Sequence, residues 1–193
     1  MWRKSFPILL VGILTLPLCD AVAHESQSPL ERSKPLAQEF MKTLMKELGV
    51  AISQGGPAGA IEVCKEVSAQ VENDFREKHE DILRVRRITL KTRNPELHTP
   101  TEEQRKWLEG MEQNWKEKPS PEPDVIESAT MTTVLFPIAI QKSLCLMCHG
   151  DPETFSSELK ESLAVHYPKD KATGYEMGDF RGALTIEWKK ANE

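Results

Sequence analysis

The sequence predicts an α+β fold, because two segments with helical periodicity near the N-terminus are followed by three segments typical of strands. The chain has 193 residues, which suits one domain with a core of its own. Charged residues make up 28% of the chain, as in folded domains rather than disordered ones. The formal charge of −5 gives no support to nucleic-acid binding, which needs a basic stripe.

Two helices are predicted in the first half of the chain. Ser28-Pro29 is typical of a helix cap with a proline in the first turn, and an apolar residue then recurs every four positions. This apolar face consists of Leu36, Phe40, Leu44 and Leu48. Gly55-Gly56-Pro57 is expected to end the helix, and a second helix is predicted over 58–76. The inner face of that second helix would consist of Ile61, Cys64, Val67 and Val71.

A strand is predicted over 82–92, where Val, Ile, Leu and Thr alternate with Arg and Lys. It is the most basic stretch of the chain, and two interpretations of its cations stay open. They form a solvated strand face, or one or two of them pair with carboxylates of a bound ligand. Asn94-Pro95 is expected to end the strand.

The later elements alternate between helix and strand. Thr99-Pro100-Thr101-Glu102 resembles a capping box that opens a structural helix with an apolar face. That face consists of Trp107, Leu108, Met111 and Trp115. The β-branched segment 130–140 predicts one or two strands interrupted at Pro137. The remaining predictions are a short polar helix over 153–163, a turn over 175–179 and a closing strand over 182–188.

Residues 1–23 have the features of a secretory signal peptide. Arg3 and Lys4 precede an apolar run over 6–18, and Ala21-Val22-Ala23 provides small residues where signal peptidase cleaves. The alternatives are an uncleaved membrane anchor and a lipoprotein anchor at Cys19. The apolar run is short for a membrane span, and the bulky Leu18 does not suit a lipoprotein motif.

The expected mature chain, 24–193, is therefore a single domain in the periplasm with no membrane attachment after cleavage. Of the four cysteines in the sequence, it retains Cys64, Cys145 and Cys148. An odd number of cysteines in an oxidising compartment requires an explanation.

The spacing of Cys145, Cys148 and His149 provides one, because Cys-x-x-Cys-His is the attachment motif of a c-type haem. Two thiols separated by two residues can add to the two vinyl groups on one edge of a porphyrin. The imidazole that follows is then held beneath the iron as its proximal ligand. The signal peptide agrees with this prediction, since thioether attachment occurs outside the bacterial cytoplasm.

Three alternatives compete with one covalent haem at this motif. A zinc ribbon needs a second Cys or His pair at similar spacing, and the sequence has none. A thioredoxin-like dithiol needs a βαβ context, which the predicted elements do not supply. A structural disulfide between Cys145 and Cys148 would leave His149 unexplained.

The second axial ligand of the iron is not determined by spacing. Cys64 on its apolar helix face is as well explained by a buried, small hydrophobic thiol as by a ligand. A methionine would be typical of electron carriers. The other candidates are four histidines: His24, His79, His98 and His166.

Four motifs in one order make the chain resemble a family of single-haem, PAS-like domains. These domains occur alone in the bacterial periplasm or as the sensor part of membrane-bound signalling proteins. The resemblance extends from about Leu36 to Trp188. The motifs are Ala60-Ile61-x-x-Cys64, Arg87-x-Thr89-Leu90-Lys91-x-Arg93-Asn94-Pro95, Cys145-x-x-Cys148-His149-Gly150-Asp151-Pro152 and Gly174-Tyr175-x-x-Gly178-Asp179-x-Arg181-Gly182-Ala183.

The resemblance implies a PAS-like antiparallel sheet with N-terminal helices packed beside it. It also implies covalent haem c on Cys145 and Cys148, with His149 and Cys64 as the axial ligands of the iron. The chain departs from the family at Leu97-His98-Thr99-Pro100, where a small-residue Asn-x-Pro is usual. This departure leaves His98 as an outside candidate for a ligand.

Arg87 and Arg93 are the predicted contacts of the haem propionates, because both lie in a family motif within the most basic stretch. For Asp179 and Arg181, an ion pair that stabilises the turn is the favoured interpretation.

The expected function is a redox or diatomic-gas sensor module that passes its signal to a separate, unidentified protein partner. A small electron-transfer cytochrome c is the alternative. Such cytochromes carry the motif near the mature N-terminus or in a last helix, whereas here a predicted strand follows His149. An enzyme is not expected, because two protein ligands would close the iron and no acid–base pair stands out.

Overall fold

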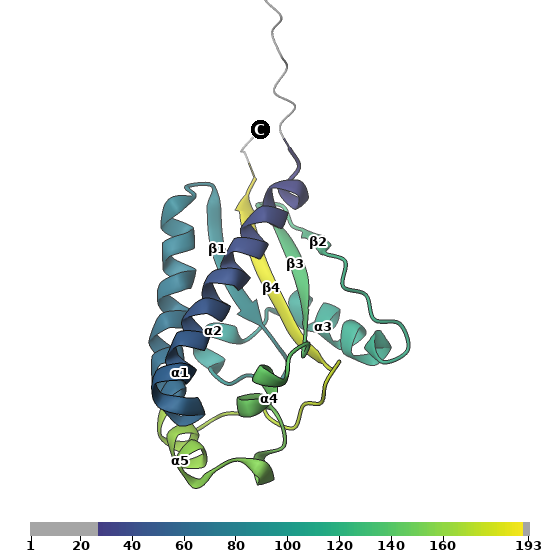
Figure 1. The fold of residues 1–193 in the computed structure, drawn as a ribbon. Helices are drawn as coiled ribbons and strands as arrows, with labels where there is room; N and C mark the ends of the chain where they lie inside the picture. Colours follow the sequence, from purple (N-terminus) through teal and green to yellow (C-terminus); the bar gives the residue numbers. More distant parts are fainter. Residues whose placement is uncertain (1–26, 191–193) are drawn as a thin grey trace, which may run out of the picture.

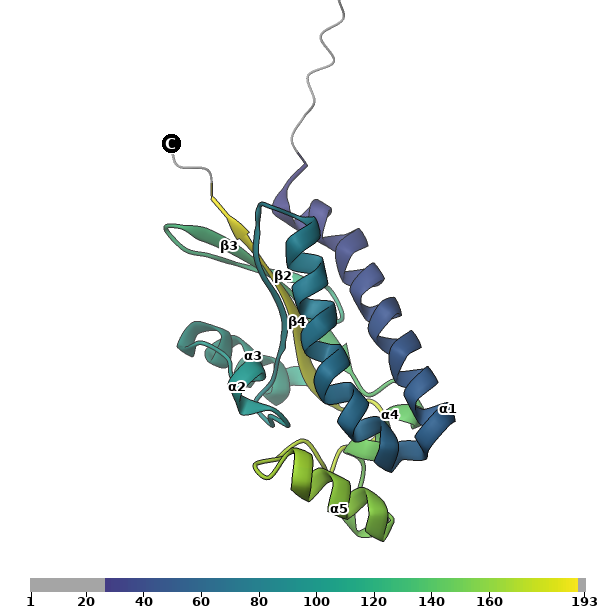
Figure 2. The same cartoon turned by 90° about the vertical axis from the view of Figure 1, so that its left-hand side faces the viewer.

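The structure, a computed structural model, describes residues 27–190, without the side chains of Val63, Cys64, Val67 and Ser68. A four-stranded antiparallel sheet lies between a long helical hairpin and a shorter helix on its other face (Figures 1 and 2). The predicted α+β class, with a PAS-like antiparallel sheet and N-terminal helices beside it, is confirmed. The expected signal peptide over 1–23 lies outside the described residues.

The hairpin is α1 (Pro29–Lys78), whose two arms are the two predicted N-terminal helices. Ser28 caps the first arm, since its side chain accepts a hydrogen bond from the backbone N–H of Glu31. Gly56 makes the bend with φ of 64° and ψ of −173°, in a left-handed region that glycine adopts with little strain. The predicted break at Gly55-Gly56-Pro57 is therefore confirmed, and the second arm ends at Lys78 rather than at 76.

The last strand of the sequence occupies the middle of the sheet. The order is β1-β4-β3-β2, and every neighbouring pair is antiparallel. The four strands are β1 (Ile82–Ile88), β2 (Asp124–Glu127), β3 (Met131–Ala139) and β4 (Phe180–Lys189). β1 ends before the predicted boundary at 92, and β2 was not predicted.

Pro137 does not interrupt the strand that contains it, so that prediction is wrong. β3 runs through Pro137 without a break, and Pro137 is paired with Ala183 of β4. β2 pairs with β3 only as far as Leu135, so the other side of Pro137 has no neighbouring strand there. A proline in a strand is tolerated where one side of the strand is open, because the lost N–H is not required on that side.

Each face of the sheet has its own hydrophobic core. Phe40 and Phe75 of α1 pack against Val85, Leu184 and Ile186 on one face. On the other face, residues of α3 (Glu102–Trp115) pack against alternate positions of the same strands. This second core is built from Ile88, Leu108, Trp115, Leu135, Phe180 and Ala183. The alternation of side chains along each strand therefore separates the two layers.

Short helices complete the fold around the lower end of the sheet in Figure 1. They are α2 (Pro95–His98), α4 (Ser143–His149), the 3₁₀ turn η1 (Pro152–Thr154) and α5 (Ser157–His166). The capping box of α3 joins Thr101 and Gln104, and so lies further along the chain than the predicted Thr99-Pro100-Thr101-Glu102. α5 packs against α1 close to its bend, through Ile61, Leu159 and Leu163.

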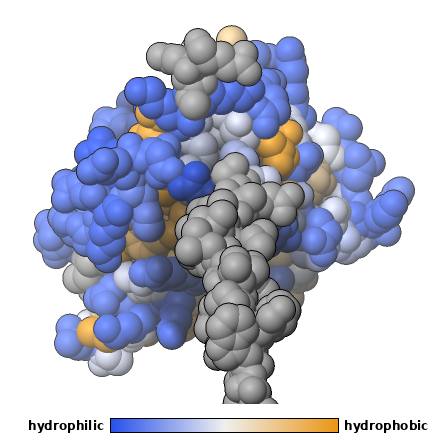
Figure 3. All heavy atoms as spheres, turned by 90° about the horizontal axis from the view of Figure 1, so that it is seen from above, coloured by the Kyte–Doolittle hydropathy of each residue, from blue (hydrophilic) through white to orange (hydrophobic). Residues whose placement is uncertain are grey.

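The face seen from above is mainly hydrophilic outside the grey residues, with a few hydrophobic side chains among the hydrophilic ones (Figure 3). Within residues 27–190, no helix combines the length and the apolar character that crossing a membrane requires.

Candidate functional site

A cavity of about 570 Å³ opens between the two arms of α1, the end of the sheet and α4. Leu44, Leu48 and Ile52 line it from the first arm of α1, and Ile138 and Ala183 line it from the sheet. Cavities of roughly 300–1,000 Å³ with apolar walls hold organic ligands of cofactor size. The site therefore suits a large, mostly apolar molecule.

The charged side chains in the described lining of this cavity are all basic. Six basic residues line it: Lys42, Lys65, Arg87, Arg93, Lys142 and Arg181. Among the described residues, none that lines it is an aspartate or a glutamate. An excess of like charge around an apolar space favours a ligand that brings negative charge of its own. The combination of apolar walls and basic residues matches an apolar ligand with carboxylate groups.

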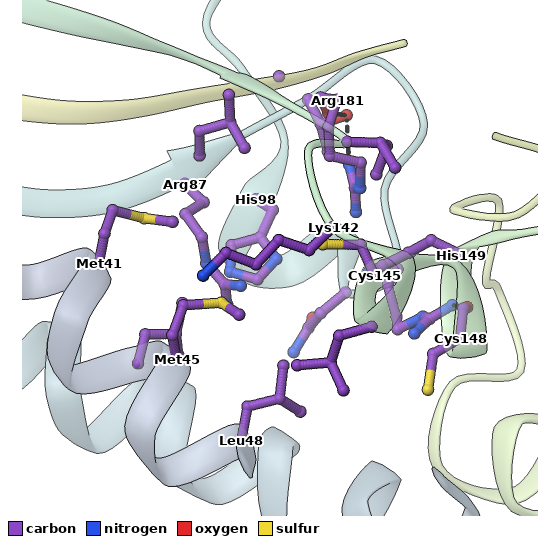
Figure 4. A pocket seen from close by; sticks show the side chains of 18 of the residues that line it. Met41, Met45, Leu48, Arg87, His98, Lys142, Cys145, Cys148, His149 and Arg181 are labelled. Carbon is purple, nitrogen blue, oxygen red and sulfur yellow. Dashed lines mark hydrogen bonds between the residues drawn. The ribbon is translucent and has the colours of Figure 1, made fainter. Parts of the chain in front are cut away.

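All three residues of the Cys-x-x-Cys-His motif lie on α4 and line the cavity. Figure 4 shows Cys145, Cys148 and His149 together at one end, and Met41 and Met45 at the other. Cys145 is partly exposed and Cys148 is buried, and no disulfide joins them. Of the described side chains, no group of three or more His, Cys, Asp or Glu is arranged to hold a metal ion. The motif thus presents two thiols and one imidazole to a large cavity rather than forming a closed metal site.

His149 is oriented by the backbone of a distant loop. Its Nδ1 lies 2.6 Å from the carbonyl oxygen of Ala172, and its ring meets that of Tyr175 edge-on, with centroids 6.3 Å apart. A carbonyl oxygen only accepts, so Nδ1 carries the proton and Nε2 keeps its lone pair. Burial holds the pKa of His149 well below its usual range, and the charges of Arg181 and Arg93 lower the pKa further. The neutral imidazole is the form that binds a metal ion, and a hydrogen bond at the other nitrogen is typical of such ligands.

Arg93 holds the peptide groups around the motif. Its Nε lies 3.0 Å from Asp170 Oδ2, and its Nη2 donates to the carbonyl oxygens of Cys148 and Ala172. The side chains of Arg93 and Asp170 are only 12% and 11% exposed, so this ion pair is largely buried. Arg93 thus connects the end of α4 to the acceptor of His149. It also lines the cavity, and its contact with a propionate stays a prediction.

Arg87 and His98 share one carboxylate on the second arm of α1. Glu72 Oε1 lies 4.0 Å from Arg87 Nε and 3.4 Å from His98 Nε2. Both Arg87 and His98 line the cavity, as Figure 4 shows. Burial lowers the pKa of His98, while its hydrogen bond with Glu72 works in the opposite direction. The propionate contact predicted for Arg87 stays a prediction, and His98 stays a candidate ligand.

Arg86 fixes the segment that carries His98. Its Nη1 donates to the carbonyl oxygens of Leu97 and Thr99, on either side of His98. Its Nη2 donates to Gln104 Oε1 at the start of α3. The segment Leu97-His98-Thr99-Pro100 is therefore anchored to β1.

The predicted ion pair between Asp179 and Arg181 does not form, so that prediction is wrong. Asp179 Oδ2 accepts from the backbone N–H of Glu176, which closes the turn. Arg181 Nη1 instead donates to Thr89 Oγ1 at 2.8 Å, and its guanidinium points from β4 into the cavity (Figure 4). Its partner is 92 positions away, so local spacing does not predict this contact, although Arg181 belongs to the motif over 174–183.

Cys64 lies in the second arm of α1, but its side chain is outside the described part of the structure. Ala60, Ile61 and Lys65 of the same arm line the cavity. Among the other ligand candidates, Met41 and Met45 line it too. His79 and His166 do not belong to its described lining, and His24 lies outside the described residues. The identity of the second axial ligand therefore stays a prediction.

Comparison with known proteins gives one family and one solved structure. The model of the Tll0287-like family matches residues 19–188, which is most of the chain. The crystal structure of the cyanobacterial heme-protein Tll0287 is similar with a TM-score of 0.61 and 21% identity. This match covers 86% of the chain and 99% of the cyanobacterial protein. No curated protein matches the chain.

Proposed function

This chain belongs to the Tll0287-like family, and on that premise we propose that it is a periplasmic protein with one covalent haem c in its cavity. The observation that carries the proposal is the placement of Cys145, Cys148 and His149 on one helix facing one large cavity. The fold that the chain shares with a cyanobacterial heme-protein agrees with it. The signal peptide over 1–23 would take the chain to the compartment in which the thioether bonds form.

The residues of the cavity fit this cofactor in three respects. Two thiols stand beside an apolar space of suitable size, an imidazole presents an unprotonated Nε2, and cations surround the space without acidic residues in its described lining. Cys145 and Cys148 would hold the haem covalently, and each S–H would add across one vinyl group, with the proton going to the second vinyl carbon. His149 would be the proximal ligand and Cys64 the second ligand.

When bound, the haem supplies an iron that changes oxidation state and can take a diatomic gas. We propose that the chain uses it as a redox or gas sensor and passes the change to a separate protein partner. The support is the position of Cys64 on α1, because the helix that carries the second ligand is also a wall of the cavity. A thiolate stabilises the ferric state, so its loss on reduction would act directly on α1.

A small electron-transfer cytochrome is the second candidate, since fold by itself does not determine function. The partly exposed Cys145 favours it, because a haem attached there would have an edge near the surface. We propose no enzymatic activity for the chain.

The test is the visible absorption spectrum of the protein after co-expression with a cytochrome c maturation system. Haem bands that persist after denaturation are expected for the parent chain and are expected to be lost in Cys145→Ser/Cys148→Ser. Ser143→Ala, an exposed change on the same helix, serves as the control. A parent chain without haem bands would overturn the proposal.

The effect of carbon monoxide on the absorption spectrum distinguishes a gas sensor from an electron-transfer or redox-sensing protein. A ferrous protein that binds carbon monoxide has a ligand that leaves the iron, and this outcome supports gas sensing. Spectra that carbon monoxide does not change in either oxidation state support electron transfer or redox sensing.

A further inference from the structure

We infer that Arg181 binds a carboxylate of the ligand in the cavity, and that it thereby determines the preference of the site for a porphyrin with free propionates. This inference rests on the proposed haem site. It adds a residue outside the Cys-x-x-Cys-His motif and outside the predicted propionate contacts, and it assigns to that residue the recognition of the ligand's charge.

No carboxylate pairs directly with Arg181. Among the described residues, none has a carboxylate within 4.0 Å of it, although the side chain faces a largely apolar cavity. Burial lowers the pKa of Arg181 and the charges of Arg87 and Arg93 lower it further, while Tyr175 and the more distant Asp170 act in the opposite direction. A guanidinium in such a place is stabilised when a carboxylate arrives with the ligand.

The other cations of the cavity either lie near an acidic side chain or are exposed. Arg93 is already neutralised by Asp170, and Arg87 lies near Glu72. Lys42, Lys65 and Lys142 are exposed to solvent, where water screens their charges. The combination of enclosure and missing acid in the described lining therefore points to Arg181.

The guanidinium of Arg181 is already held in place. Its Nη1 donates to Thr89 Oγ1 at 2.8 Å and to the carbonyl oxygen of Lys91 at 3.4 Å. Its central carbon, Cζ, lies over the ring of Tyr175, 5.2 Å from the ring centroid. Both hydrogen bonds use one nitrogen of a group that has five N–H donors. A carboxylate can thus be bound without a large loss of side-chain freedom.

The experiment compares two porphyrins on the full mature chain in a Cys145→Ser/Cys148→Ser background, which prevents thioether formation. Haemin and haemin dimethyl ester are titrated separately, and each Kd is taken from the Soret band. The ratio of the two Kd values measures the contribution of free propionates. It is compared for the parent, Arg181→Gln and Arg84→Gln, where Arg84 is an exposed arginine of β1 outside the cavity.

The parent is expected to prefer haemin, and Arg181→Gln is expected to reduce that preference by at least about tenfold, the size of one charge-assisted hydrogen bond. Arg84→Gln is expected to leave it unchanged within about twofold, as for a surface substitution. An unchanged preference in Arg181→Gln would overturn the inference alone. If the parent binds neither porphyrin, the proposed function fails, and the inference fails with it.

A second variant keeps the comparison decisive if Arg181→Gln does not fold, which circular dichroism would show. Arg181→Lys keeps the charge and loses the planar, two-pronged donor set. We expect Arg181→Lys to reduce the preference for haemin, measured as the ratio of the two Kd values, by about threefold or more. A preference equal to that of the parent would overturn the inference.

Discussion

His149 and Ala172 are joined by a hydrogen bond in which the ring Nδ1 lies 2.6 Å from the carbonyl oxygen. The same carbonyl accepts from Arg93 Nη2, and Arg93 also donates to the carbonyl of Cys148. The end of α4 and the loop before β4 are thus held together by one arginine that follows β1. The orientation of the imidazole therefore depends on contacts far from the motif in sequence.

Replacing Arg93 is expected to destabilise the protein strongly. Arg93→Met removes the ion pair with Asp170 and leaves a largely buried carboxylate without its cation. Breaking a buried pair from one side costs about 3–5 kcal/mol, and the remaining exposure reduces this to about 2–4 kcal/mol. Urea unfolding of the haem-free chain measures the change.

The control for this prediction is Lys34→Met, which removes a solvent-exposed pair with Glu31. It is expected to change the free energy of unfolding by less than about 1 kcal/mol, as is usual for surface ion pairs. Equal effects of Arg93→Met and Lys34→Met would contradict the structural role of Arg93.

Gly182 is expected to tolerate no side chain. A Cβ there would lie 2.2 Å from the carbonyl oxygen of Ile88, and its φ of 139° is strained for other residues. Gly182→Ala should lower the midpoint of thermal unfolding and the yield of folded protein. Gly110→Ala in α3 is the control, since nothing lies within 4 Å of its Cβ. It should be stabilising by about 0.5–1 kcal/mol, because alanine is the better helix former.

Acidification is expected to destabilise the protein in part through His98. Burial lowers the pKa of His98, so the folded protein binds this proton less readily than the unfolded chain does. The hydrogen bond to the carboxylate of Glu72 opposes this shift, and the charges of Arg87 and Arg181 add to it. Stability from this residue is therefore complete above an unfolded pKa of about 6.5 and is lost as the pH falls below it.

The measurement is urea unfolding of the haem-free parent and of His98→Gln between pH 5 and pH 8. The contribution of one histidine to the slope is at most about 1.4 kcal/mol per pH unit. His98→Gln should flatten the profile below pH 6.5 and leave the two profiles parallel above it. Profiles that stay parallel throughout the range would show that His98 does not contribute.

Cys64→Ala is expected to change both the ferric and the ferrous spectra of the holoprotein, because the iron would lose its thiolate ligand. Met41→Leu and Met45→Leu, which alter cavity-lining sulfurs of similar size, are the controls and should leave both spectra as they are. Spectra of Cys64→Ala identical to those of the parent would rule out the proposed ligand. A changed spectrum in either methionine variant would then identify the ligand.

The sequence by itself determined the structural features that depend only on neighbouring residues. The cap at Ser28, the break at Gly56 and the strand of β4 follow from neighbouring residues, and the structure confirms all three. The Cys-x-x-Cys-His motif is local in the same sense, because its chemistry depends on spacing within one turn of helix. These features are predictable because propensity, capping and short-range spacing act within a few residues.

Tertiary structure alone decided which side chains meet across the cavity. Arg181 donates to Thr89, and Arg93 contacts Asp170 and Ala172. Pro137 is tolerated in β3 because the pairing with β2 does not extend beyond Leu135. Each depends on the pairing of β4 between β1 and β3, which joins segments far apart in the chain. Local patterns cannot specify such contacts, since burial and charge compensation are properties of the assembled layers. For that reason the sequence predicted the thiols and the imidazole, whereas the cation without a counter-charge became visible only in the fold.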